Sequence, residues 1–256
     1  MFFLAAFAGL GLAAGFLGAV LGMGGGLFIV PAITALFGLP LRTAVGASLL
    51  GIIATSVGVA CTARPGRAAD ISLAMRLELV TSVGAIGGSL LAGVIPTRVL
   101  YGVFAIVVVA TAAYTAFKSR IISTANPGGP HTIQHWPAGL AASAVAGALS
   151  GLTGVGGGFL KVPVMFAVMH VPFATATATS SFMVGITAAT SASIYLARGD
   201  VHPLVAAPLC LGAILGAAIG GSVAHLIPTA PLRRSLIAVL VVVAVEMMWK
   251  ALRGAA

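Results

Sequence analysis

Eight apolar runs occupy most of this chain of 256 residues, at positions 2–37, 44–63, 77–95, 99–117, 137–169, 173–197, 204–227 and 235–249. A helix that crosses a bilayer needs about 20 apolar residues, which is near the length of most of these runs. The first and fifth runs are too long for one crossing, because about 35 residues would reach roughly 50 Å across a hydrocarbon core of about 30 Å. The pattern predicts an all-α, polytopic membrane protein.

The composition agrees with lipid as the main solvent. The chain is 60% hydrophobic and 7% charged, whereas a soluble domain is about 25% charged. Its net charge of +9 would favour nucleic-acid binding in a soluble protein. Here the basic residues stand mostly at the ends of apolar runs, as loop charges do in membrane proteins, which argues against a nucleic-acid partner. They are Arg42, Arg64, Arg67, Arg98, Lys118, Arg120, Arg198, Arg233, Arg234, Lys250 and Arg253.

A glycine cluster interrupts each of the two long runs. Residues 22–31 read GMGGGLFIVP and residues 154–163 read GVGGGFLKVP. Glycine costs about 1 kcal/mol in a helix interior and proline about 3 kcal/mol, so neither segment is expected to stay in regular helix. Each long run is predicted to be a helix, a break and a second helix or half-helix.

One shift of 132 positions aligns these two motifs and much of their surroundings. It places Pro40 on Pro172, Ser48 on Ser180, and 95–97 (Ile-Pro-Thr) on 227–229 (Ile-Pro-Thr). The pattern predicts two homologous repeats of about four hydrophobic segments each, at 1–117 and 137–256, joined by a polar linker at 118–136. Duplication with broken helices at matching positions is typical of secondary transporters. His131 and His135 have a spacing that would suit a metal, but without an acidic partner they are interpreted as loop residues.

Irregular backbone inside a membrane must line a cavity or be buried in protein, so the two breaks are expected to meet around a polar cavity. Free N–H groups at the start of a half-helix bind anions, and glycine lets a ligand approach the backbone. Tight packing of small residues between helices is the alternative interpretation. The predicted substrate-binding residues from the two breaks are Gly24, Gly25, Gly26, Pro31, Gly156, Gly157, Gly158 and Pro163.

Hydroxyl-bearing residues follow each break and extend this prediction. Ser48 and Ser180 occupy equivalent positions, and Thr179 belongs to a dense Ser/Thr stretch. Hydroxyls can hold an anion without a fixed charge, although each can also bond to its own helix. Lys161 lies inside the second motif, where a charge is costly in a membrane and usually functional. It is predicted to attract the anion, with snorkelling to the interface as the alternative.

No enzyme is indicated. The sequence lacks a nucleotide loop in the required order, a nucleophile with its base, and a metal-ligand cluster. No cofactor, metal or catalytic residue is therefore expected. Glu78 and Glu246 are the acidic residues of the apolar runs, and both stand near segment ends, so no chain of proton-carrying groups is indicated.

The paired motifs resemble those of the TauE/SafE-type sulfite exporters, the broad TSUP family. The segment GVGGGFLKVPVM at 154–165, followed by VPFATATATSSFMVGITAATSASIYLARGDVHPLVAAPLCLG at 171–212, is especially similar to the second half of that family. The resemblance covers nearly the whole chain and implies a permease for small sulfur-containing anions such as sulfite and organosulfonates. Ser181 stands where many members carry Asn.

The sequence thus predicts a secondary transporter of the bacterial inner membrane that exports a small anion, with sulfite or an organosulfonate favoured by the resemblance. Its partners are the substrate and the lipid bilayer, and a homodimer is left open. The alternatives are a permease or channel for another solute, such as a carboxylate, and a membrane assembly factor without flux. Two topologies also stay open. Loop charge favours eight single crossings, whereas run length favours two hairpins and inverted halves.

Overall fold

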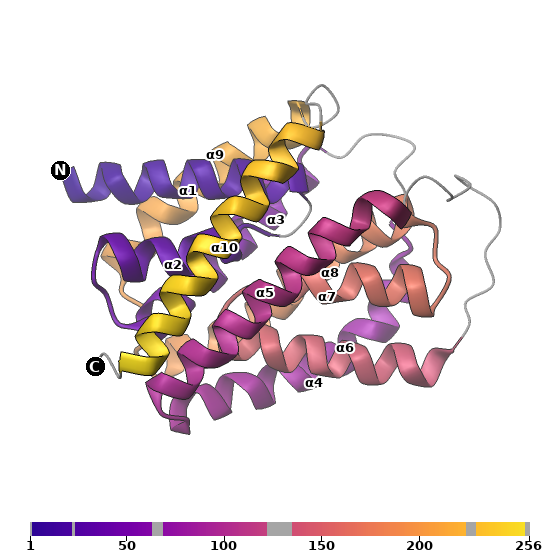
Figure 1. The fold of residues 1–256 in the computed structure, drawn as a ribbon, viewed down its shortest axis with the longest axis horizontal. Coiled ribbons are helices and arrows are strands. Elements are labelled where there is room, and N and C mark those ends of the chain that lie inside the picture. The colour runs from indigo at the N-terminus through magenta and orange to yellow at the C-terminus, as the bar shows by residue number, and fades with distance from the viewer. Residues whose placement is uncertain (1, 22–23, 63–68, 122–134, 224–228, 254–256) are drawn as a thin grey trace.

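The computed structural model describes residues 2–21, 24–62, 69–121, 135–223 and 229–253, and within that part of the chain it is helical without strands (Figure 1). The helices of the first half are α1 (Phe2–Leu21), α2 (Gly26–Leu36), α3 (Leu41–Ala60), α4 (Ile71–Val94) and α5 (Thr97–Ile121). Those of the second half are α6 (Trp136–Thr153), α7 (Gly158–Pro163) continued by the π-helix η2 (Val164–Val168), α8 (Phe173–Ala197), α9 (Pro203–Val223) and α10 (Thr229–Arg253). Most of the predicted linker, with His131, lies outside the described residues.

The helix bounds repeat at the same spacing as the sequence. Adding 132 to the bounds of α2 gives 158–168, which α7 and η2 occupy together, and adding it to α5 gives 229–253, the bounds of α10. Each half therefore has four apolar segments, of which the first is split into two helices. These matching bounds support the interpretation that the chain is a duplication.

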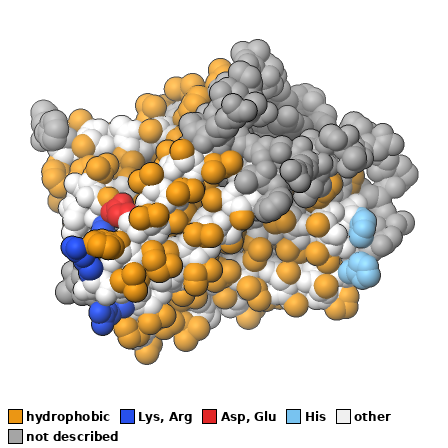
Figure 2. All heavy atoms as spheres, viewed as in Figure 1, with side chains coloured by type: hydrophobic (Ala, Val, Ile, Leu, Met, Phe, Trp, Pro, Cys, Tyr) orange, Lys and Arg blue, Asp and Glu red, His pale blue; other side chains and the backbone are white. Residues whose placement is uncertain are grey.

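The surface of the bundle is apolar enough to face lipid. Five helices within the described residues have the length and composition of a membrane span: α1, α3, α4, α8 and α9. Large apolar side chains on α4, such as those of Leu79 (73% exposed) and Val83 (70% exposed), lie on the outer surface. Figure 2 shows hydrophobic side chains over most of the described face, with Lys, Arg and an acidic residue gathered at its left end. The chain is an integral membrane protein, as the sequence predicts.

Glycines set how closely two pairs of helices pack. A methyl group added to Gly212, Gly216 or Gly220 of α9 would clash with the carbonyl oxygen of Ala8, Leu12 or Phe16 of α1, respectively. The same close approach joins α4 to α6, where Gly84 and Gly88 lie against Ala144 and Ala148. Small residues allow backbones to approach in membranes, where packing drives helix association. In each pair the contacting residue numbers rise together along both helices, so α1 and α9 run parallel, and so do α4 and α6.

The order of contacts decides between the two topologies left open by the sequence. Helices α3 and α8 occupy equivalent positions in the two halves but run antiparallel, because Gly46 lies near Tyr195 whereas Ser56 bonds to Ser181. The two halves are therefore inverted relative to each other, and Figure 1 shows α1 and α6 starting at opposite ends of the molecule. The single-crossing arrangement favoured by loop charge is wrong for this structure.

Both long apolar runs fold back as hairpins. At the end of α2, the Phe37 ring stacks on Phe7 of α1 with 4.3 Å between ring centroids. In the second half, Gly139 near the start of α6 lies against Met169, which follows η2. The turns of the two hairpins are the predicted glycine breaks.

Candidate functional site

The two breaks have the same backbone conformation. Gly24 and Gly25 have φ angles of 78° and 77°, and the equivalent Gly156 and Gly157 have φ angles of 90° and 68°. A side chain at these angles would strain the backbone, which explains why glycine stands at these positions. Gly25 precedes α2 and Gly157 precedes α7, so both half-helices begin at a left-handed glycine.

The structure brings the two breaks together in the interior. A methyl group added to either Gly24 or Gly156 would lie 3.0 Å from Val184 Cγ1, and both sites also adjoin Ile52. Ile52 of α3 and Val184 of α8 are equivalent under the shift of 132 positions. This pair of apolar side chains, called here the Ile52–Val184 pair, lies between the two breaks.

Direct polar contact also joins the halves at this place. The Ser48 hydroxyl donates a hydrogen bond of 2.8 Å to the carbonyl oxygen of Gly154. That oxygen lies so close to Gly26 that a methyl group there would be 2.4 Å from it. Ser48 thus holds the second break against the start of α2.

A small cavity adjoins the Ile52–Val184 pair. Its volume is about 10 Å³, enough for roughly one water molecule. The lining residues are Gly18, Gly24, Thr55, Ser56, Val59, Ser181 and Val184. Three hydroxyls face this space, and each donates to a main-chain carbonyl: Thr55 to Gly51, Ser56 to Ser181, and Ser181 to Thr177. The space at the Ile52–Val184 pair, called here the centre, is therefore closed to anything larger than water.

The remaining predicted residues do not line this cavity. Ser180 is fully buried, and its hydroxyl has no partner among the described residues. Ser180 is the repeat equivalent of Ser48, whose partner is the Gly154 carbonyl. The equivalent partner for Ser180 would be Gly22, which lies outside the described range. Thr179 accepts a 3.0 Å hydrogen bond from the Asp70 N–H and so holds the start of α4. Pro31 lies within α2, and Pro163 marks the change from α7 to the π-helix.

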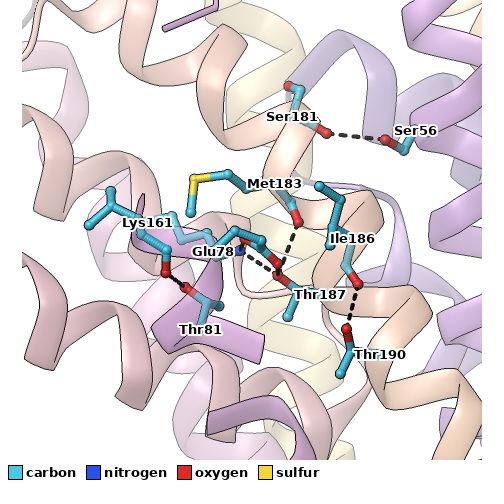
Figure 3. Close-up of polar contacts among 10 residues, drawn as sticks. Ser56, Glu78, Thr81, Lys161, Ser181, Met183, Ile186, Thr187 and Thr190 are labelled. Carbon is cyan, nitrogen blue, oxygen red and sulfur yellow. Dashed lines mark hydrogen bonds and ion pairs between the residues drawn. The ribbon is translucent and has the colours of Figure 1, made fainter. Parts of the chain in front are cut away.

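Lys161 belongs to a buried charged cluster, shown in Figure 3. It is 1% exposed, and its Nζ lies 3.1 Å from Glu78 Oε2 of α4. The Thr187 hydroxyl of α8 accepts a 2.6 Å hydrogen bond from Lys161 and donates to the other carboxylate oxygen of Glu78. Lys161 therefore does not snorkel, and a carboxylate compensates its charge.

Sequence reasoning treated Lys161 and Glu78 separately, although they form one unit. The positions equivalent to Lys161, Glu78 and Thr187 in the other half are Ile29, Cys210 and Thr55, so the repeat offers no second copy of the pair. The available signal was that isolated opposite charges in apolar runs tend to pair. Ile52, Val184 and Ser56 were also missed, because apolar and hydroxyl residues are common in every run.

The chain is similar to membrane proteins of one family over nearly its whole length. The family model described as "Sulfite exporter TauE/SafE" matches residues 7–247. "Probable membrane transporter protein YunE" of Bacillus subtilis is 28% identical over 94% of this chain and 96% of its own length. "Probable membrane transporter protein YdhB" of the same organism is 25% identical over 89% of this chain and 91% of its own length. No solved structure matches the chain.

Proposed function

The chain belongs to the sulfite exporter TauE/SafE family, and from this premise we propose that it exports a small oxyanion bound between its two glycine breaks. Membership makes it a membrane transporter and not an enzyme. Sulfite or an organosulfonate is the proposed substrate, since the family's description names sulfite.

The observation that carries the proposal is the meeting of the two breaks at the Ile52–Val184 pair. Gly24 and Gly156 approach the same two side chains from opposite halves. Inverted halves whose broken helices converge are the arrangement in which transporters bind solutes near the middle of the membrane.

The main-chain N–H groups at the first break favour an anion over a cation. The N–H groups of Gly24, Gly25 and Gly26 have no main-chain acceptor among the described residues. The start of α2 adds a partial positive charge, and Ser56 and Ser181 can exchange their carbonyl partners for a substrate oxygen. Glu78 compensates Lys161, so this site would hold an anion by dipoles without a net fixed charge.

Loose binding of this kind suits export. The membrane potential supplies about 2.3 kcal/mol per elementary charge per 100 mV, and with the inside negative it drives an anion outward. A dianion would gain roughly twice that energy. Release then depends on separating the Ile52–Val184 pair, which closes the centre in this conformation.

Flux assays test this proposal. Purified protein in proteoliposomes should carry sulfite or a sulfonate, and Val184→Phe should abolish that flux because a ring would fill the closed centre. Val83→Phe is the matched control, since Val83 is 70% exposed on α4 and the same change there should leave flux intact.

Carboxylate flux without sulfur-oxyanion flux would assign a different substrate. A protein that folds but shows neither flux nor a thermal shift with any anion would instead be an assembly factor. Equal flux in Val184→Phe and the unmodified protein would contradict the location of the path.

A further inference from the structure

A second cavity of about 340 Å³ opens at the end of the molecule where α3 begins and α10 ends. It is far larger than the closed centre, whose volume is about 10 Å³. Its lining comes from α2, α3, α5, α10 and the loop before α3: Thr34, Gly38, Leu39, Pro40, Leu41, Arg42, Thr97, Tyr101 and Lys250. We call this cavity the Arg42–Lys250 vestibule.

Two cationic side chains line the vestibule. Lys250 donates to the Thr34 carbonyl at 3.0 Å and lies 3.0 Å from Glu246 Oε1, one turn earlier in α10. Glu246 does not line the cavity, and its side chain is 32% exposed, so solvent screens this pair. Arg42 has no carboxylate within ion-pair distance among the described residues. The lining therefore carries two positive charges, of which Lys250 is paired with Glu246 and Arg42 is not paired with a carboxylate among the described residues.

The donors of Arg42 are only partly used. One terminal nitrogen donates to the Ile95 carbonyl at 3.1 Å, while the buried Nε has no partner among the described residues. A guanidinium has five N–H donors in a planar fork that matches the oxygens of an oxyanion.

From these observations we infer that the Arg42–Lys250 vestibule binds a small oxyanion before or after its passage through the centre. Arg42 supplies the fork, Lys250 supplies a second charge, and the hydroxyls of Thr97 and Tyr101 add donors. The start of the 20-residue helix α3 contributes a partial positive charge to the same space. The chemistry required of the ligand is a compact anion with several acceptor oxygens, such as a sulfonate or sulfite.

The site makes the two sides of the transporter chemically different. The position equivalent to Arg42 in the second half is Ala174, so the equivalent place on the opposite side has no guanidinium. Ser48, at the closed centre, stands seven residues beyond Leu41 on α3, about 10 Å along the helix axis. Anion captured at the vestibule would therefore have a short path to the central site. The role of the vestibule in transport rests on the proposed function, whereas the binding of an anion to the vestibule does not.

Equilibrium binding and flux are measured together to test it. The protein is placed in nanodiscs of neutral phosphatidylcholine and titrated calorimetrically with sulfite and with methanesulfonate at low and high salt. Arg42→Gln should raise the Kd at least tenfold and flatten its salt dependence, while Arg42→Lys should recover part of the affinity. Arg253→Gln is the control, because Arg253 lies in the same last turn of α10, stacks on Trp249 and does not line the vestibule.

The outcomes separate this inference from the proposed function. Normal anion binding and flux parameters in Arg42→Gln and in Lys250→Gln, each correctly folded, would overturn the vestibule while leaving transport intact. Arg42-dependent binding without flux would support the vestibule and reject transport. A lipid phosphate could satisfy the same donors, so the titration is repeated with phosphatidylglycerol present. If that lipid competes with the anion and the competition depends on Arg42, the ligand of the vestibule is a lipid headgroup. If the lipid leaves anion binding unchanged, the ligand is a free solute.

Discussion

Replacing Lys161 by Met is the sharpest test of the buried charged cluster. The substitution nearly preserves side-chain length but leaves Glu78, which is 5% exposed, without its cationic partner. Removing one member of a buried ion pair typically costs about 3–5 kcal/mol, because the other charge stays buried and uncompensated. Lys161→Met should therefore destabilise the protein by roughly that amount.

The size of this effect makes it measurable by thermal unfolding. In a domain of this size, 1 kcal/mol corresponds to about 2–4 °C in Tm, so the expected drop is roughly 6–20 °C. The assay is circular dichroism of the protein in detergent micelles at a pH where the carboxylate is charged. Lys250→Met is the control, since the pair with Glu246 is partly exposed and should be worth less than about 1 kcal/mol.

A double variant distinguishes pairing from anion attraction. Adding Glu78→Gln to Lys161→Met removes the lone charge and keeps an acceptor for Thr187, so most of the lost stability should return. If Lys161 instead acts mainly on the substrate, the single variant would keep its Tm and lose anion affinity. That result, or a double variant no more stable than the single one, would refute the pairing argument.

Two further predictions concern the centre and its driving force. Gly26→Ala should disrupt folding, because the added methyl group would lie 2.4 Å from the Gly154 oxygen. Gly87→Ala is the control and should be tolerated, because a methyl group there meets nothing within 4 Å. Size-exclusion chromatography and thermal unfolding compare the two variants. Anion flux in proteoliposomes should follow an imposed potassium-diffusion potential and ignore a pH gradient at fixed substrate charge. Flux driven by the pH gradient at zero potential and stopped by Glu78→Gln would instead make Glu78 the coupling residue.

The parts of the fold that depend on local chain properties could be predicted from the sequence. The apolar runs predicted the long helices, and the glycine clusters predicted breaks between α1 and α2 and between α6 and α7. The direction of the halves was harder, because loop charge and run length pointed to different arrangements. Run length was the better guide, since a run too long to cross must turn whatever its flanking charges are.

Contacts between distant residues could not be predicted in the same way. Lys161 and Glu78 are 83 positions apart, and nothing in their local sequence names the partner. The vestibule likewise joins Arg42 to Lys250 across almost the whole chain, so neither residue stood out in its own segment. Thr179, which is predicted to bind substrate, accepts from the Asp70 backbone, and its local sequence did not indicate that contact.

The parallel packing of α1 on α9 has a consequence for how the chain is made. The carbonyls of α1 fit against glycines about 200 positions later, so until α9 has been synthesised the first helix packs only on the hairpin partner α2 and on α3. At about 5–20 residues per second, that delay is roughly 10–40 s. Throughout it, the face of α1 that later packs on α9 must be covered by lipid or by the insertion machinery. Two fragments divided at the linker should therefore be unstable when expressed singly, yet should assemble into one complex when made in the same cell.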